Sequence, residues 1–271
     1  LHHVAPDEKS VFEWVRDYLD YMPSSAHEAP PIINPGLEPE ITESDLSLNT
    51  YMPDSDNAPY DVREIIMRVF DDGAFHEIGE LYAPNMITGF SRVDGRSVGI
   101  VANQPAVMGG VLDTDSSEKA TRFIRLCDAY NIPLVFLVDT PGVLPGLAEE
   151  QKGTIRRSGR LGYATLEASV PKVTVILRKA YGGAYAVMGS KHLHTDINFA
   201  WPTGKIAVMG AESAAAILTR RQTENMSAAD ADRVRRDFID FYNMTMATPY
   251  QAAERGYIDA VIEPSQTRLE L

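Results

Sequence analysis

The segment VILRKAYGGAYAVMGS holds two adjacent glycines, Gly182 and Gly183, where an apolar strand-like run changes to a helical pattern. Adjacent glycines let the backbone approach a ligand closely. A helix that begins there directs its free N–H groups and the positive end of its dipole into the turn. Backbone donors of this kind can stabilise a negative oxygen in a transition state by about 3 kcal/mol each. The pattern therefore indicates an oxyanion site built from backbone, although tight helix–strand packing would favour the same small residues.

A second candidate is VFLVDTPGVLPG, residues 135–146, in which an apolar strand is followed by two Pro-Gly pairs. The DTPG part resembles the magnesium-side element of a GTPase, but the sequence contains no G-x-x-x-x-G-K-[ST] phosphate loop. Nucleotide hydrolysis is therefore disfavoured. One Pro-Gly pair would be explained by turn formation. Two pairs on either side of Val143 and Leu144 suggest a backbone shaped around a ligand.

Three further patterns favour structural roles. The HLHTD segment, 192–196, has an H-x-H spacing without an H-E-x-x-H pattern, so surface histidines are expected and no metal site is predicted. Cys127 lies in a helical apolar pattern and is expected to be a packed core thiol. The DTDSSEK segment, 113–119, is interpreted as the start of a helix with Ser116 or Ser117 as its N-cap.

Charge and composition limit the class of protein. The 271 residues carry a formal net charge of −13, which argues against a surface for nucleic-acid phosphates. No run of 18 apolar residues and no signal peptide is visible, and a single cysteine suits a reducing cytoplasm. Because the chain begins with Leu1 and its last residues fall inside an apolar-periodic run, we interpret it as a piece of a longer protein.

The elements expected to position the two candidate motifs alternate along the chain. A helix over 10–21 precedes a segment rich in proline and acidic residues, and an amphipathic helix from Tyr60 is expected to stop at Gly73. A β-hairpin over 86–103 should turn at Asp94–Gly95. Beyond it we expect helix 116–131, strand 133–140, helix 153–169, strand 172–178, a helix from 182, strand 197–202, helix 211–221, two polar helices and strand 258–264. This order predicts an α/β fold with a partly parallel sheet.

Several long motifs together resemble the carboxyltransferase (β) subunits of biotin-dependent acyl-CoA carboxylases. They are NPGLEPEI, PDSDNAPYDVREII, GRSVGIVANQP, FLVDTPGVLPG, PKVTVILRKAYGGAYAVMGSK, FAWPTGKIAVMGAE and AAERGYIDAVIEP. The resemblance implies a crotonase-like (ClpP/crotonase) fold of ββα units in the C-terminal domain of a two-domain subunit. Residues 1–25 would close the preceding N-terminal domain, 26–58 would be a linker or extended segment, and 59–271 would form the biotin-side domain.

The resemblance also implies the reaction, which is transfer of CO2 from carboxybiotin to the α-carbon of an acyl-CoA. The biotin is carried by a partner, and its ureido group supplies the base, so the protein needs no catalytic acid or base of its own. The implied oxyanion donors are the backbone N–H groups of Gly183 and Ala184, and we expect Gly183 to be too crowded for a branched side chain. The implied biotin and acyl pocket has no metal and comprises Gly142, Val143, Gly182, Tyr185 and Ala186, with VANQP as nearby scaffolding.

Partners and substrate follow from the same resemblance. Family subunits form hexamers, in which the N-terminal domain of one subunit meets the C-terminal domain of another, and they work with a biotin carboxylase/biotin carrier (α) subunit. At Ala186 many propionyl-type relatives carry aspartate and many acetyl-type relatives carry isoleucine. The small alanine favours a long-chain acyl-CoA, as in the β subunits of mycolate-making actinobacteria. Propionyl- or acetyl-CoA is the alternative.

Three other functions remain open from the residues. A crotonase-type hydratase or hydrolase would need a placed carboxylate, for which Glu149 and Glu150 are the near candidates, although both resemble first-turn helix acids. The α subunit of a biotin-dependent acyl-CoA decarboxylase would perform the same chemistry in reverse. A non-catalytic assembly subunit is disfavoured by the intact GGAY sequence.

Overall fold

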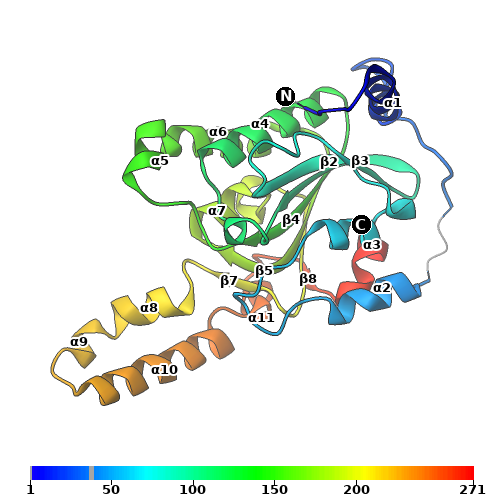
Figure 1. The fold of residues 1–271 in the computed structure, drawn as a ribbon. Helices are drawn as coiled ribbons and strands as arrows, with labels where there is room; N and C mark the ends of the chain where they lie inside the picture. Colours follow the sequence, from blue (N-terminus) through cyan, green and yellow to red (C-terminus); the bar gives the residue numbers. More distant parts are fainter. Residues whose placement is uncertain (1, 37–39) are drawn as a thin grey trace.

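A computed structural model describes residues 2–36 and 40–271, so residues 37–39 of the NPGLEPEI motif lie outside the described part. One mixed sheet runs through the molecule in the order β1-β2-β3-β4-β5-β6-β8, and β7 pairs with β5 beyond the end of β6 (Figure 1). Pairing is antiparallel from β1 to β3 and parallel from β3 onward. The strands are β1 His76–Glu77, β2 Met86–Val93, β3 Arg96–Asn103, β4 Leu134–Thr140, β5 Lys172–Tyr181, β6 Ile197–Ala200, β7 Lys205–Ala207 and β8 Ala260–Val261.

Helices cover both faces of this sheet. The α-helices are α1 Glu8–Leu19, α2 Glu43–Ser47, α3 Arg63–Val69, α4 Thr114–Ala129, α5 Leu147–Lys152, α6 Thr154–Glu167, α7 Gly182–Val187, α8 Ala211–Leu218, α9 Arg220–Thr223, α10 Ala228–Thr245, α11 Pro249–Glu254 and α12 Thr267–Glu270. Short 3-10 turns span Leu48–Thr50 (η1), Asp71–Gly73 (η2), Met108–Gly110 (η3), Lys191–Leu193 (η4) and Pro264–Gln266 (η5). This arrangement confirms the predicted α/β class.

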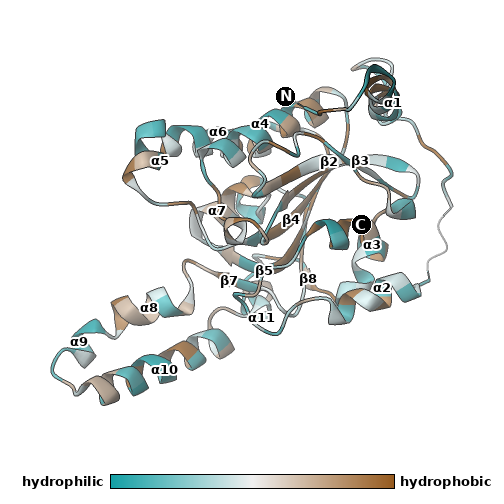
Figure 2. Ribbon diagram, in the orientation of Figure 1, coloured by the Kyte–Doolittle hydropathy of each residue, from teal (hydrophilic) through white to brown (hydrophobic). Residues whose placement is uncertain are grey.

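Alternate residues of the central strands pack into two separate cores. Phe136 and Ile176 join the core under α4 and α6, whereas Val135 and Val175 join the core under α3. Parallel strands with helices on both faces bury both sets of side chains, which explains why these runs are almost continuously apolar. Figure 2 shows hydrophobic colours along β4 and β5 and hydrophilic colours on the outer turns of α4, α5 and α6.

The predicted hairpin is confirmed. Strands β2 and β3 pair from Met86↔Asn103 to Val93↔Arg96, which leaves Asp94 and Gly95 as a two-residue turn. Both have positive φ, 47° and 73°. Because a type I′ turn requires positive φ at both central positions, Asp-Gly is well suited to this turn.

Two predicted helix ends are wrong. The N-cap of α4 is Asp113, whose carboxylate accepts a hydrogen bond from the Ser116 N–H, while the Ser116 hydroxyl bonds back to the Asp113 N–H. The two residues form a capping box that starts the helix earlier than either serine would. The amphipathic helix from Tyr60 is shorter than expected, because α3 ends at Val69 and Gly73 belongs to the turn η2.

Two peripheral segments extend from this body. Helix α1 packs Trp14 and Tyr18 against the core near β1 and β2. Helices α8, α9 and α10 form an arm that projects from the end of the sheet (Figure 1). Within the predicted linker, residues 43–50 form α2 and η1. Among the helices of the described residues, none is long and apolar enough to cross a membrane.

Candidate functional site

The two glycine-rich motifs lie side by side at the carboxyl edge of the sheet. Strands β4 and β5 are parallel neighbours, and Thr140 pairs with Ala180 at their last contact. The loop 141–146 therefore leaves the sheet next to the turn that begins α7. In open parallel sheets this edge is where ligands usually bind.

The glycine pair forms the first turn of α7, which has six residues. The helix begins at Gly182, whose φ is +58°, and the N–H groups of Gly182, Gly183 and Ala184 lie in its first turn. N–H groups at these positions have no acceptor within the helix itself. Their role as oxyanion donors stays a prediction.

Crowding lies at Gly182 rather than at Gly183. Gly182 has φ +58°, and a Cβ there would stand 2.9 Å from the Val208 carbonyl oxygen. Gly183 is exposed, and a Cβ would meet no atom within 4 Å. The crowding expected for a branched side chain at Gly183 is not seen around a Cβ there, because the backbone of Val208 approaches Gly182 instead.

The second candidate motif is the loop after β4, which lies beside the first turn of α7. Gly142 and Gly146 have φ values of 143° and 137°, which favour glycine. The loop is fixed by a parallel bridge in which the Leu112 N–H donates to the Gly142 carbonyl at 3.0 Å and the Leu144 N–H donates to the Leu112 carbonyl at 2.7 Å. The half-buried Val143 packs on the core between these bonds. The loop thus has a defined shape in which two glycines take a conformation unfavourable for other residues.

Tyr185 and Ala186 continue α7 beyond the donors. Tyr185 is buried, and its hydroxyl has no hydrogen-bond partner among the described residues. Burial raises the pKa of Tyr185 to about 12, so the phenol remains a neutral donor at physiological pH. Ala186 is half-buried and lies three residues after Gly183, so the two share one side of the helix.

Glu149 cannot act as the base of a hydratase. Its carboxylate accepts hydrogen bonds from Lys152 Nζ at 2.8 Å and from the N–H and hydroxyl of Thr114 at 3.0 and 2.8 Å. The bond from Lys152, followed by those from Thr114, lowers the pKa of Glu149 to about 2. Since an effective general base has a pKa near the working pH, this carboxylate is too acidic. Glu149 and Glu150 lie in the first turn of α5, as predicted.

The surroundings of the remaining candidate residues favour structural roles. Cys127 is fully buried in the core, and burial raises the pKa of its thiol well above the usual range. His192 makes edge-to-face contacts with the rings of Tyr185 and Tyr257. Within residues 2–36 and 40–271, no group of three or more His, Cys, Asp or Glu side chains is arranged to hold a metal ion.

The VANQP segment is scaffolding near the site, as expected. The buried Gln104 side chain accepts a hydrogen bond from the Val62 N–H at 3.2 Å and donates to the Asp61 carboxylate at 2.6 Å. Asn103 accepts from the Asp139 N–H at 3.3 Å. These bonds connect the end of β3 to the start of α3 and to β4.

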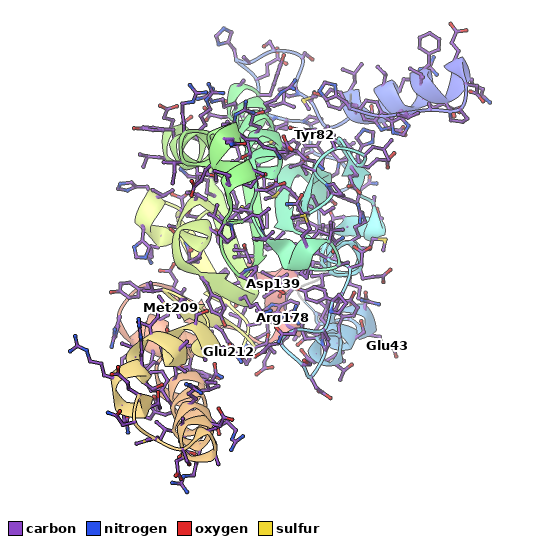
Figure 3. The ribbon with its side chains drawn as sticks, turned by 60° about the vertical axis from the view of Figure 1, so that its left-hand side comes forward. Glu43, Tyr82, Asp139, Arg178, Met209 and Glu212 are labelled. Atoms are coloured by element: carbon purple, nitrogen blue, oxygen red, sulfur yellow. The ribbon has the colours of Figure 1, made fainter. Side chains whose placement is uncertain are left out.

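A buried ion pair beside the site was not predicted. Asp139 in β4 and Arg178 in β5 are 1% and 5% exposed at the side chain, and Arg178 Nε lies 2.9 Å from the Asp139 carboxylate (Figure 3). One signal was available in the sequence, because Asp139 is the single charged residue of the strand-like run 133–140 and Arg178 directly follows the apolar run 173–177. Buried charges in such runs need a partner, which the neighbouring strand supplies.

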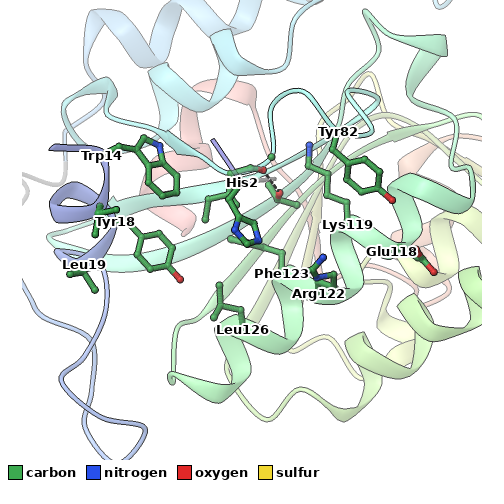
Figure 4. A pocket seen from close by; sticks show the side chains of 14 residues that line it. His2, Trp14, Tyr18, Leu19, Tyr82, Glu118, Lys119, Arg122, Phe123 and Leu126 are labelled. Carbon is green, nitrogen blue, oxygen red and sulfur yellow. Dashed lines mark hydrogen bonds between the residues drawn. The ribbon is translucent and has the colours of Figure 1, made fainter. Parts of the chain in front are cut away.

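A cavity of about 760 Å3 lies elsewhere, between α1 and α4. Figure 4 shows Trp14, Tyr18 and Leu19 on one side and Lys119, Arg122 and Phe123 on the other. The Lys119 ammonium donates to the Met86 carbonyl at 2.7 Å. The residues that line the cavity come from α1, β2, α4 and adjoining segments, so the cavity is separate from the glycine-rich edge.

Comparison with known proteins identifies one family over the whole chain. Residues 1–271 match the family model described as "Carboxyl transferase domain". The biotin-dependent long chain acyl-coenzyme A carboxylase beta4 subunit of Mycobacterium tuberculosis is 54% identical over 271 residues, covering 100% of this chain and 52% of that protein. The propionyl-CoA carboxylase beta chain of Saccharopolyspora erythraea is 52% identical, covering 98% of this chain and 50% of its own.

A solved structure agrees in fold. The transcarboxylase 12S crystal structure, described as a hexamer assembly with methylmalonyl-coenzyme A and methylmalonic acid bound, superimposes with a TM-score of 0.93. It is 43% identical, and the match covers 100% of this chain and 51% of that one. The chain therefore spans about half the length of the relatives it matches.

Proposed function

The chain belongs to the carboxyl transferase family, and from that premise we propose that it is the biotin-side, C-terminal domain of the carboxyltransferase subunit of an acyl-CoA carboxylase. The observation that carries this proposal is the Thr140↔Ala180 pairing, which brings the PGVLPG loop beside the first turn of α7. The two motifs thereby face one small region at the carboxyl edge of the sheet.

The residues at this edge suit a biotin ureido group. That group has a carbonyl oxygen that becomes negative when CO2 leaves, so it needs hydrogen-bond donors and little else. The first-turn N–H groups of Gly183 and Ala184 are such donors. When bound, carboxybiotin supplies the CO2 and the base. The chain's residues bind the oxygen, through Gly183 and Ala184, and shape the opposite wall, through Gly142 and Val143.

The role of the Gly183 N–H can be tested by removing only that donor. Proline is tolerated in the first turn of a helix and has no N–H. In the full-length subunit with its biotin-carrying partner, Gly183→Pro should reduce kcat by about 100-fold or more, the usual loss for one oxyanion donor. Gly183→Ala keeps the N–H and adds a Cβ in open space, so its loss should be far smaller. Equal losses in both variants would refute the donor role.

For the substrate we propose a long-chain acyl-CoA, with use in lipid synthesis of the mycolate-making type. The supporting observations are the small Ala186 on the same side of α7 as Gly183 and the 54% identity to a long-chain acyl-CoA carboxylase subunit. Propionyl-CoA is a second candidate because a propionyl-CoA carboxylase subunit is 52% identical. The proposal further includes a biotin carboxylase/biotin carrier (α) partner and a hexamer of full-length subunits.

Chain length can be tested with a ladder of acyl-CoA substrates from acetyl to long chains. A change of one methylene-sized volume in a pocket alters selectivity by about 10-fold or more. Ala186→Ile should therefore shift preference toward short chains, while Ala253→Ile in α11, another half-buried alanine, should leave the profile unchanged. A wild-type subunit that uses only acetyl- or propionyl-CoA, with an Ala186→Ile profile that does not move, would refute the long-chain assignment.

A further inference from the structure

The register between β4 and β5 changes just before the proposed site. The strands pair without interruption from Leu134↔Lys172 to Val138↔Ile176, and the next pair is Thr140↔Ala180. Between these pairs β4 has one residue, Asp139, and β5 has the three residues 177–179. A bulge of this kind bends a strand and redirects the residues that follow it. Here those residues are the two walls of the site.

The Asp139 side chain bonds across the bulge. One carboxylate oxygen accepts the Lys179 N–H at 3.0 Å, and the other accepts Arg178 Nε at 2.9 Å. The regular pairing of β4 with β5 is interrupted at Lys179. The Asp139 carboxylate therefore accepts the Lys179 N–H, which receives no acceptor from the backbone of β4 there. Figure 3 labels both charged side chains, one from each strand.

Tyr60 and the segment before it complete this cluster. The Tyr60 hydroxyl donates to the Asp139 carboxylate at 2.8 Å. Arg178 Nη1 donates to the carbonyls of Ser55 and Ala58 at 3.2 and 3.0 Å, and the guanidinium lies 4.9 Å from the centre of the Tyr60 ring. The three side chains thus join β4, β5 and the segment 55–60.

Stability alone does not account for such a buried pair. Burial raises the pKa of the Asp139 carboxyl, although Arg178 and the Lys179 N–H act in the opposite direction. Ionising Asp139 in this environment therefore costs free energy. Buried ion pairs are often no more stabilising than apolar residues of the same volume, but they fix one geometry. The geometry fixed here is the offset between the ends of β4 and β5.

We propose that Asp139, Arg178 and Tyr60 are positioning residues, which set the PGVLPG loop at its working distance from the Gly183 and Ala184 donors. Asp139 precedes Gly142 by three residues, and Arg178 precedes Gly182 by four, so a small shift at the bulge moves both walls. This inference rests on the proposed function of the glycine-rich edge. The three side chains contact no reacting atom and act only through the backbone.

Two tyrosine variants separate positioning from stability. Tyr60→Phe removes one 2.8 Å hydrogen bond, to Asp139. Tyr51→Phe removes another 2.8 Å hydrogen bond, to the Asp61 carbonyl, from a ring that packs edge-to-face on Tyr60. In the full-length subunit with its biotin-carrying partner, both variants should stay folded, with the larger fall in Tm in Tyr60→Phe because its acceptor is a buried carboxylate, and both are assayed well below their Tm. Only Tyr60→Phe should lower kcat, by about tenfold, with KM for acyl-CoA unchanged within about twofold, because small misplacements of reacting groups slow chemistry steeply.

Hydrogen exchange gives a readout independent of activity. Amides of 140–146 and 182–187 should exchange faster in Tyr60→Phe than in Tyr51→Phe. Arg178→Lys should show the same pattern, since an ammonium cannot reproduce the forked contacts of a guanidinium. Equal kcat and equal exchange in the two tyrosine variants would overturn the positioning role while leaving the proposed function intact. A wild-type subunit that carboxylates no acyl-CoA would overturn both.

Discussion

At the scale of single residues, the two glycines of the turn, Gly182 and Gly183, have different structural roles. Gly182 has a left-handed backbone and faces the Val208 carbonyl, whereas Gly183 has a helical position and open space. Gly182→Ala should therefore lower the free energy of unfolding by about 1–2 kcal/mol, the usual cost of a left-handed backbone. Gly183→Ala should be neutral or slightly stabilising, because alanine favours a helix. Urea unfolding of the two variants measures both effects, and a more damaging Gly183→Ala would contradict the assignment.

Glu149 should contribute to stability in a pH-dependent way. Its folded pKa of about 2 lies below its ordinary value of 4.5, so its ionised form is favoured by folding. The contribution is present above about pH 4.5 and is lost as the pH falls toward 2. Glu149→Gln should destabilise the chain at pH 7, and its difference from wild type should shrink steadily between pH 4.5 and 2. Glu150→Gln, an exposed neighbour in α5, serves as the control. A difference that stays constant with pH would show that the carboxylate charge is unimportant.

The sequence predicted some of these residues and missed others for physical reasons. The GGAY turn and the PGVLPG loop were found because glycine and proline act locally on the backbone. Crowding at Gly182 comes from Val208, 26 residues later, and the ion pair joins Asp139 to Arg178 across two strands. Periodicity does not reveal which distant atoms meet, so neither contact could be predicted from spacing.

At the scale of elements, the start of α4 depends on a capping box. The Asp113 carboxylate accepts the Ser116 N–H at 2.9 Å. Asp113→Ala should lower the free energy of unfolding by about 1 kcal/mol. Asp113→Asn keeps a side-chain acceptor, so its loss should be only about a few tenths of a kcal/mol. Thermal unfolding of the two variants tests the cap. A loss as large in Asp113→Asn would point instead to the negative charge at the helix N-terminus.

Element boundaries were the less predictable part of the fold. The hairpin 86–103 was placed correctly because Asp94–Gly95 permits the two positive φ angles that a tight turn requires. The start of α4 was misplaced because aspartate and serine can each cap a helix, and sequence alone does not decide which one begins it. The end of α3 was misplaced because Gly73 serves a following 3-10 turn.

At the scale of the whole molecule, we expect this chain alone to fold but not to carboxylate acyl-CoA. Its sheet has two hydrophobic cores, whereas the chain spans about half the length of its relatives, and the resemblance implies that the C-terminal domain of one subunit meets the N-terminal domain of another. Cooperative thermal unfolding together with no product from carboxybiotin and acyl-CoA is the expected result. Product formation by the 271-residue chain would show that one domain is sufficient. The full-length subunit, assayed beside it with the same carrier, provides the positive control.

The edges of the sheet have a consequence for aggregation. Its outermost strands, β1 and β8, have only two residues each. Beyond β1, the Ile78 N–H bonds to the Thr88 carbonyl, and the Ser91 hydroxyl bonds to the Ala74 carbonyl. Such short outermost strands leave little unpaired backbone on which a second chain could add a strand. In the described part of the chain, therefore, the long apolar strands of the core lie inside the sheet, where they cannot pair with strands of another molecule to form amyloid-like aggregates.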